Sequence, residues 1–98
     1  MKMLIVEDDL TSRTLMQEYL APYGECHTAG NGKVAIETFR RAAEQGARYD
    51  LVCLDIMMPE MDGQAVLAEI RRMEEADSIA PPEAVKIIMT TGLGDMQS

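Results

Sequence analysis

The sequence predicts an α/β fold, a doubly wound parallel sheet with helices on both of its faces. Three observations lead to this prediction. Short apolar runs, each long enough for one buried strand, alternate with segments whose apolar residues recur at helical spacing. The alternation is regular, which calls for parallel strands joined by right-handed helical crossovers. The length of 98 residues suits one small domain.

Four elements are expected in the first half of the chain. Residues 3–6 form a continuous apolar run that stops at three acids, as a buried strand would. A helix over 11–23 follows and is ended by a proline–tyrosine–glycine turn. Residues 25–29 make a weaker strand between glycines, and a helix over 33–45 stops at the next glycine. The apolar faces of these helices are Leu15, Met16, Tyr19, Leu20 and Tyr23, then Ala35, Ile36, Phe39, Ala42 and Ala43.

Three further elements are expected in the second half. Residues 51–54, LVCL, have the composition of a strand buried on both faces. A helix over 63–75 follows an aspartate–glycine pair, and a last strand is expected over 85–90. The apolar face of this helix is Val66, Leu67, Ile70 and Met73. Residues 74–84 are the nearest thing to a flexible insert, and we expect no chemistry from them.

The composition is that of an acidic globular domain. Hydrophobic residues make up 47% of the chain, and 17 acidic against 9 basic residues give a net charge of −8. This charge disfavours nucleic acid and anionic membranes as partners, because both are polyanions. No apolar run approaches membrane-spanning length, and the start, MKMLIVEDD, turns acidic too early for a signal peptide. We therefore expect a cytoplasmic chain whose two cysteines, Cys26 and Cys53, are reduced.

Three carboxylates follow two of the expected strands. Glu7 and Asp8 come after the strand over 3–6, and Asp55 follows the strand over 51–54. In open parallel sheets the functional crevice lies outside the carboxyl ends of the strands, so these acids converge if the two strands are neighbours. Three like charges in one crevice call for a cation, and oxygen ligands favour Mg²⁺.

Such a site would suit phosphoryl transfer to a carboxylate. A metal ion would neutralise the transferring group, and Asp55 would then act as the nucleophile. The alternative for each acid taken singly is a helix cap or a turn residue. We expect this simpler role for Asp62, which precedes Gly63, and Asp9, Thr11 or Ser12 could cap the helix that follows the first acids.

These segments resemble the receiver domain of two-component response regulators. LIVEDD is similar to the acidic pair of that family, and LDIMMPEMDG is similar to its phosphoacceptor segment, with Asp55 at the phosphorylated position. IIMTTG resembles the end of the fourth strand and places Thr91 at the switch threonine. The resemblance runs from Lys2 to about Gly92. It implies a flavodoxin-like sheet with strand order 2-1-3-4.

The resemblance also implies a role for each site residue. Asp8 would bind Mg²⁺ directly and Glu7 mainly through water, while Asp55 would supply a carboxylate oxygen and Met57 its backbone carbonyl. Thr91 would hydrogen-bond a phosphoryl oxygen. The phosphoryl donor would be the phosphohistidine of a sensor histidine kinase or phosphotransfer protein, and a downstream effector would read the changed surface. Such a domain contributes to its own phosphorylation and dephosphorylation but is not a turnover enzyme.

The chain departs from the family pattern after the fourth strand. Family members continue with a fourth helix, a fifth strand that carries a phosphoryl-binding lysine, and a fifth helix. Lys86 stands at the start of the fourth strand, at the wrong end of the sheet for that role. We therefore expect a receiver domain over 1–98 that is truncated after its fourth strand. The exposed sheet edge would be covered by the rest of a longer chain or by a partner, such as a second copy.

Two other functions stay open. The missing lysine favours a pseudo-receiver, an interaction module that is not phosphorylated. A Mg²⁺-dependent phosphohydrolase with an aspartyl nucleophile usually carries a second acid two residues on, where this chain has Met57. Because methionine has no good group with which to position the attacking water, we predict slow hydrolysis of a phosphoryl group on Asp55.

Several conspicuous residues are given structural interpretations. His27 has no partner motif around it, so a structural or exposed role is expected. The methionines at 16, 73 and 89 fall on apolar faces and are expected to fill the core. The arginine pairs at 40–41 and 71–72 are expected on solvated helix exteriors.

Overall fold

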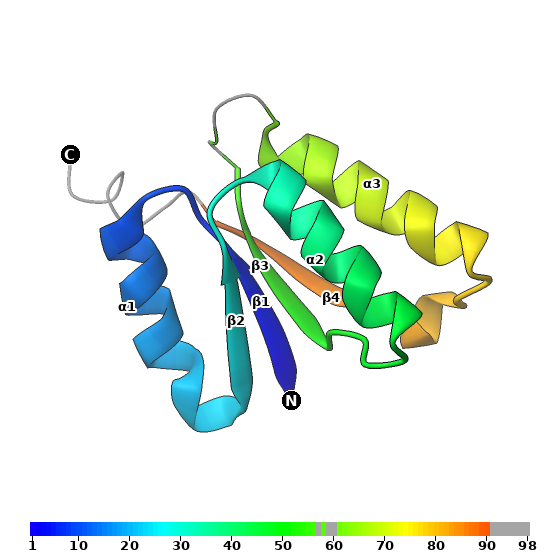
Figure 1. The fold of residues 1–98 in the computed structure, drawn as a ribbon, viewed down its shortest axis with the longest axis horizontal. Coiled ribbons are helices and arrows are strands. Elements are labelled where there is room, and N and C mark those ends of the chain that lie inside the picture. Colours follow the sequence, from blue (N-terminus) through cyan, green and yellow to red (C-terminus); the bar gives the residue numbers. More distant parts are fainter. Residues whose placement is uncertain (57, 59–60, 91–98) are drawn as a thin grey trace.

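The computed structural model describes residues 1–56, 58 and 61–90, and it contains a four-stranded parallel sheet with the order β2-β1-β3-β4. The strands are β1 (Lys2–Val6), β2 (Glu25–Ala29), β3 (Leu51–Asp55) and β4 (Lys86–Thr90). The helices are α1 (Leu10–Leu20), α2 (Gly32–Glu44) and α3 (Gly63–Ala76), with short 3₁₀ helices η1 (Ala21–Tyr23) and η2 (Pro81–Glu83). As Figure 1 shows, α1 covers one face of the sheet, and α2 and α3 lie together on the other. The predicted fold class and strand order are confirmed.

The sheet register places the first and third strands side by side. Val6 of β1 pairs with Leu54 of β3. The next residues, Glu7 and Asp55, therefore come at the same edge of the sheet on neighbouring strands. Asp55 belongs to β3 itself, one residue beyond the strand expected from the sequence, because it still pairs with Thr90 of β4.

The main core lies between the sheet and the pair α2 and α3. Alternate residues of the two central strands point into it and are fully buried, among them Leu4, Val6, Val52 and Leu54. The helices contribute, in chain order, Ala35, Ile36, Phe39, Ala42, Val66 and Ile70. At about 25 cal/mol per Å² of apolar surface, this burial is the main stabilising contribution to the fold. The predicted faces of both helices are largely confirmed.

Each helix begins at a polar cap at the carboxyl edge of the sheet. The side chain of Asp9 accepts a hydrogen bond from the Ser12 amide at 2.8 Å, which starts α1. Asn31 and Asp62 cap α2 and α3 in the same way, each at 2.9 Å. Such caps satisfy backbone donors that the helix leaves unpaired. The capping roles expected for Asp9 and Asp62 are therefore confirmed.

Gly63 brings α3 directly against the end of β3. A Cβ atom at this position would lie 2.5 Å from the backbone oxygen of Asp55, which no side-chain movement can relieve. The Gly63 amide donates to the Ile56 oxygen at 3.2 Å. Only glycine therefore fits between the start of α3 and the segment that carries Asp55.

The face covered by α1 differs from the sequence prediction. The predicted helix over 11–23 is wrong at its end, because α1 stops at Leu20 and η1, with Pro22 near its start, continues the chain. Tyr19 is 67% exposed and Tyr23 is equally open, so neither belongs to a core. Met16 is only half-buried. These side chains stay accessible because α1 packs on β1 and β2 and so covers only part of the sheet. On β4, Ile88 is 52% exposed.

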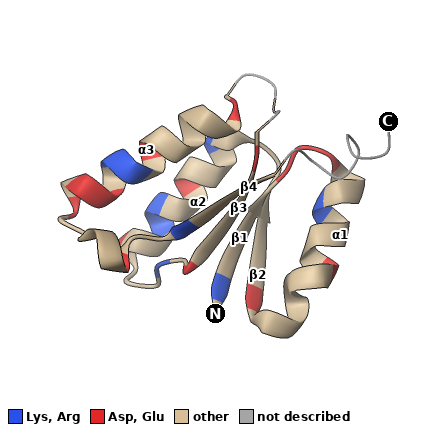
Figure 2. Cartoon of the chain, turned by 180° about the vertical axis from the view of Figure 1, so that it is seen from behind, with Lys and Arg blue, Asp and Glu red and all other residues tan. Residues whose placement is uncertain are grey.

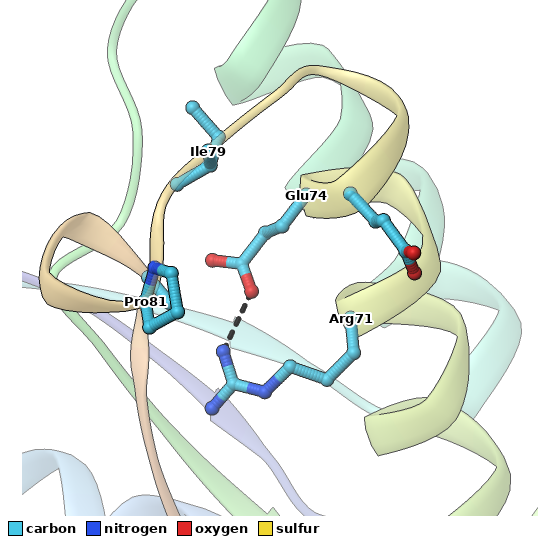
Figure 3. Close-up of a pocket in the computed structure, with 6 residues that line it drawn as sticks. Arg71, Glu74, Ile79 and Pro81 are labelled. Atoms are coloured by element: carbon cyan, nitrogen blue, oxygen red, sulfur yellow. Dashed lines mark hydrogen bonds and ion pairs between the residues drawn. The ribbon is translucent and has the colours of Figure 1, made fainter.

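Residues 74–84 also differ from the prediction. The prediction of a flexible insert is wrong for Glu74, which lies within α3 and is only 4% exposed. Its carboxylate accepts from the Val85 amide at 2.7 Å and from Arg71 Nη1 at 2.6 Å, so Arg71 does not simply solvate the helix. Figure 3 shows the pair facing each other beside a pocket of about 410 Å³, with Ile79 and Pro81 on its far side. The bond from the Val85 amide therefore fastens the end of the α3–β4 connection onto α3, and the half-exposed Arg71 partly neutralises the buried Glu74 carboxylate.

Candidate metal centre

Three acids converge at the carboxyl edge of β1 and β3. Glu7, Asp8 and Asp55 each offer a carboxylate oxygen, and these atoms all lie within 4.8 Å of one another. Glu7 is 5% exposed and Asp55 is 3% exposed, whereas Asp8 is open to solvent. In Figure 2 the acidic segment between β1 and α1 lies at the same edge of the sheet as the acidic end of β3. The convergence predicted from the strand ends is therefore found in the structure.

The surroundings of Glu7 favour its protonated form. The pKa of Glu7 is raised from its ordinary 4.5 to about 8, mainly by burial and then by the adjacent carboxyl group of Asp55. The negative charges of Asp55 and Asp8 act in the same direction, while the Ser12 hydroxyl lowers the pKa by donating to the carboxylate. The site thus favours an added positive charge at neutral pH.

The donor set fits a hard divalent cation. Within the described part of the chain, Glu7 Oε2 is buried and has no hydrogen-bond partner. A buried oxygen without a partner is costly, and a cation among the three acids would satisfy it. Oxygen-only donors suit Mg²⁺, and the exposure of Asp8 leaves room for the water molecules that this ion retains.

Neighbouring acids have separate roles. Asp9 directly follows Asp8, yet its side chain caps α1, and the bond from Ser12 is the main reason that its pKa is lowered. Asp62 is likewise engaged with the start of α3. The three-acid cluster is therefore distinct from the capping acids beside it, as expected from the sequence.

Two predicted site residues lie outside the described residues. Met57, expected to offer its backbone carbonyl, and Thr91, expected as the switch threonine, both fall there, as does Pro59 of the phosphoacceptor segment. Thr90 precedes Thr91 and is half-buried at the end of β4, beside Asp55 in the sheet register. Lys86 starts β4 and lies at the opposite edge of the sheet from the acids.

Sequence reasoning missed two residues of the first turn of α1. Ser12 is 2% exposed and its side chain lowers the pKa of Glu7, and Arg13 Nη1 donates to the backbone oxygen of Glu7 at 3.1 Å. The sequence could have indicated both residues, because a small polar residue and a basic residue follow the acids by four to six positions. At that spacing, side chains in the first turn of a helix point back toward the loop that precedes the helix.

His27 has a structural role on β2, which is an outer strand of the sheet. Its Nε2 lies 2.7 Å from Glu25, and its Nδ1 lies 2.6 Å from the hydroxyl of Tyr49. The structural interpretation is therefore confirmed.

Cys26 and Cys53 are free thiols. Among the described residues no helix has both the length and the apolar character needed to cross a bilayer.

The fold and the site together define a class of protein. A doubly wound parallel sheet with an acid cluster at its carboxyl edge is the arrangement of α/β domains that bind ligands there. The chain belongs to the response regulator receiver domain family, whose model matches residues 3–98. The resemblance noted in the sequence is confirmed.

Curated relatives extend well beyond this domain. The chain is 36% identical to the probable transcriptional regulator ycf27 of Cyanophora paradoxa and 38% identical to that of Pyropia yezoensis, over 97% of its own length in each case. It spans only 34% of each of these two relatives, about a third of their length. It is also 34% identical to hybrid signal transduction histidine kinase B of Dictyostelium discoideum, of which it spans 4%.

Solved structures show the same fold. The receiver domain of the histidine kinase CKI1 from Arabidopsis thaliana, complexed with Mg²⁺ and BeF₃⁻, matches with a TM-score of 0.76 and 28% identity. That match covers 90% of this chain and 63% of the other. The response regulator TrrA from Thermotoga maritima, in complex with Mg²⁺-BeF, matches with a TM-score of 0.67 and 28% identity over 98% and 91% of the two chains.

Proposed function

We propose that this receiver domain accepts a phosphoryl group on Asp55 in a Mg²⁺-dependent transfer from a phosphohistidine. One observation carries the proposal: the carboxylate oxygens of Glu7, Asp8 and Asp55 lie within 4.8 Å of one another. Relatives whose solved structures contain Mg²⁺ and a beryllofluoride support it. A magnesium ion would be held by Glu7, Asp8 and Asp55, and by the backbone carbonyl of Met57.

The chemical step is a displacement at phosphorus. A carboxylate oxygen of Asp55 forms the new P–O bond while the P–N bond to the donor imidazole breaks, and the imidazole departs with the bonding electrons. Bound Mg²⁺ would supply neutralisation of the charge on the transferring group. Asp55 is almost fully buried, so its environment excludes most water, and Gly63 fixes the backbone that carries it.

Thr91 is proposed to couple phosphorylation to a change of surface. It directly follows Thr90, whose strand position pairs with Asp55. A threonine hydroxyl there would donate to a phosphoryl oxygen on Asp55, and its movement would alter the neighbouring surface. With Met57 two residues after Asp55, we propose slow loss of the phosphoryl group.

The partners follow from the same chemistry. The donor would be a sensor histidine kinase or a phosphotransfer protein, and a downstream effector would read the phosphorylated surface. The receiver domain, over residues 1–98, would act as a cytoplasmic signalling switch that binds neither nucleic acid nor membrane itself. It takes part in its own phosphorylation and dephosphorylation without turning over small molecules.

Incubation with acetyl phosphate and Mg²⁺ tests the proposal directly. Intact-mass spectrometry should show one added phosphoryl group in the wild type and none in Asp55→Asn. Asp62→Asn is the matched control, because asparagine caps a helix as well as aspartate does and this variant should be labelled normally. Continuous release of phosphate would favour the phosphohydrolase, and no labelling with or without Mg²⁺ would favour the pseudo-receiver.

A further inference from the structure

Arg13 reaches from the first turn of α1 back to the acid cluster. Its Nη1 donates to the backbone oxygen of Glu7 at 3.1 Å, and its side chain is half-buried. A Cβ atom placed on Gly30, in the loop between β2 and α2, would lie 2.9 Å from the same nitrogen. The guanidinium group is thus held between the loop that carries the acids and the loop that follows β2.

The backbone of Glu7 is fixed on both sides of the residue. Its amide donates to the Ala29 oxygen at 3.1 Å, and its carbonyl accepts from Arg13. The amide bond continues the β1–β2 ladder by one residue, whereas the carbonyl bond is supplied by a side chain. The carbonyl of Glu7 is part of the peptide unit that leads to Asp8, so Arg13 restrains the junction between two acids of the cluster.

We propose that Arg13 is a positioning residue for the divalent-cation site, acting through the Glu7–Asp8 peptide and not by touching the ion. The inference rests on the proposed function, because it concerns the same site. Partners that orient metal ligands generally change metal affinity by about ten- to a hundredfold when they are removed.

A purely electrostatic role and a positioning role of Arg13 predict opposite changes in Mg²⁺ affinity when the residue is removed. Removing a cation beside a divalent-ion site lowers repulsion and should tighten Mg²⁺ binding. Removing a restraint on the ligands should weaken it. A loss of affinity on removal of Arg13 therefore identifies positioning, because neither the lost charge nor a residue without influence on the site produces that sign.

The first test compares three variants by calorimetric titration with Mg²⁺. Arg13→Met keeps the apolar stem without donor or charge and should bind about tenfold more weakly than the wild type. Arg13→Lys keeps a charged donor and should stay within about threefold. Arg41→Met is the control, since Arg41 lies near the far end of α2 and pairs only with Glu37 in the described interactions. It should bind as the wild type does.

Gly30→Ala provides a second test that leaves the arginine charge in place. Within the described residues the new Cβ would meet only Arg13, and Gly30 does not have a left-handed backbone, so the substitution should displace the guanidinium and little else. It should weaken Mg²⁺ binding in the same direction as Arg13→Met. The double variant should show little further loss, because both changes break one contact.

The outcomes separate the two proposals. Wild-type protein that binds no Mg²⁺ would overturn the proposed function and the inference with it. Wild-type binding with unchanged or tighter binding in Arg13→Met would overturn the inference alone. Fully additive losses in the double variant would also overturn it, because Gly30 would then act by another route. If Arg13→Met fails to fold by circular dichroism, Gly30→Ala and Arg13→Lys still decide the question.

Discussion

The carboxyl groups of Glu7, which directly follows β1, and of Asp55, at the end of β3, are both nearly inaccessible, and their oxygens lie within 4.8 Å of each other. Like charges so close ionise together only at a cost, which is one reason why the pKa of Glu7 is raised to about 8. Protonation at this pair should therefore be coupled both to metal binding and to the free energy of unfolding.

Without divalent cations, the protein should lose stability as the pH rises. The pKa of Glu7 is about 8 in the folded chain against an ordinary 4.5, so the folded state binds more protons between these values. Its contribution is complete below pH 4.5 and is lost as the pH rises through 8, at no more than about 1.4 kcal/mol per pH unit. Urea unfolding in EDTA across this window measures it. Glu7→Gln, which stays neutral, should remove this part of the slope, and an unchanged slope would contradict the assignment.

Mg²⁺ binding should release a proton and tighten as the pH rises. Because the ion replaces the proton on Glu7, affinity should increase from pH 6 toward 8 and level off above it, by at most about tenfold per pH unit. Calorimetry in two buffers with different ionisation enthalpies counts the released protons. Equal heats in the two buffers at pH 7 would show that no proton leaves.

Asp8 and Asp9 should respond differently to the same substitution. Asp8→Asn removes a cluster ligand and should weaken Mg²⁺ binding at least about tenfold. Asp9→Asn removes the same charge one residue away but keeps the cap of α1, so its effect should be small. Calorimetric titration compares the two variants. Equal losses would mean that general electrostatic attraction, and not ligation by Asp8, sets the affinity.

Gly63→Ala should damage both stability and the metal site. The added Cβ meets the Asp55 backbone oxygen, so the segment must move at a cost of roughly 1–3 kcal/mol, and Asp55 moves with it. Gly46→Ala is the comparison: that glycine has φ +71° and open space around it, so alanine costs about 1–2 kcal/mol there with no steric contact. Urea unfolding and Mg²⁺ titration of both variants should show weakened binding only in Gly63→Ala.

The pair of buried Glu74 and half-exposed Arg71 should matter more than a largely exposed pair. Arg71→Met takes the cation from a buried carboxylate that keeps the Val85 amide as a donor, and it should cost about 1–3 kcal/mol of unfolding free energy. Arg72→Met removes the partner of Glu69 in a largely exposed pair and should cost no more than about 1 kcal/mol. Chemical denaturation of the two variants measures the difference. Similar costs would show that burial of Glu74 does not make the pair important.

The sequence predicted the elements that depend on local pattern. The apolar runs around Leu4 and Val52 are buried strands because both of their faces are covered near the centre of the sheet. The acids that end those runs meet because parallel strands share one edge. Asp62 was expected to be a cap or turn residue, and the structure shows the cap, because its side chain accepts from the Ala65 amide.

The sequence predictions failed where the surroundings of a residue are set by a distant part of the chain. Tyr19 lies on an apolar helical face, but burial needs a second layer, and among the described residues α1 packs mainly on β1, β2 and η1. Glu74 looks like a solvated helix residue until the following connection folds back and brings the Val85 amide to it. Arg13 is unremarkable in sequence, because its partner, the carbonyl of Glu7, carries no side-chain signal.

The parallel topology has a consequence for anions as well as for cations. All three helices start at the carboxyl edge of the sheet, each at a capped end, so the positive ends of their peptide dipoles face the side where the acids lie. Each such end favours a nearby negative group by about 0.3–1 kcal/mol. A doubly charged anion at this edge of the sheet is repelled by the acids while no cation neutralises them, and it is attracted by the aligned backbone amides of the helix starts. Metal binding would remove the repulsion and would therefore determine whether such an anion binds.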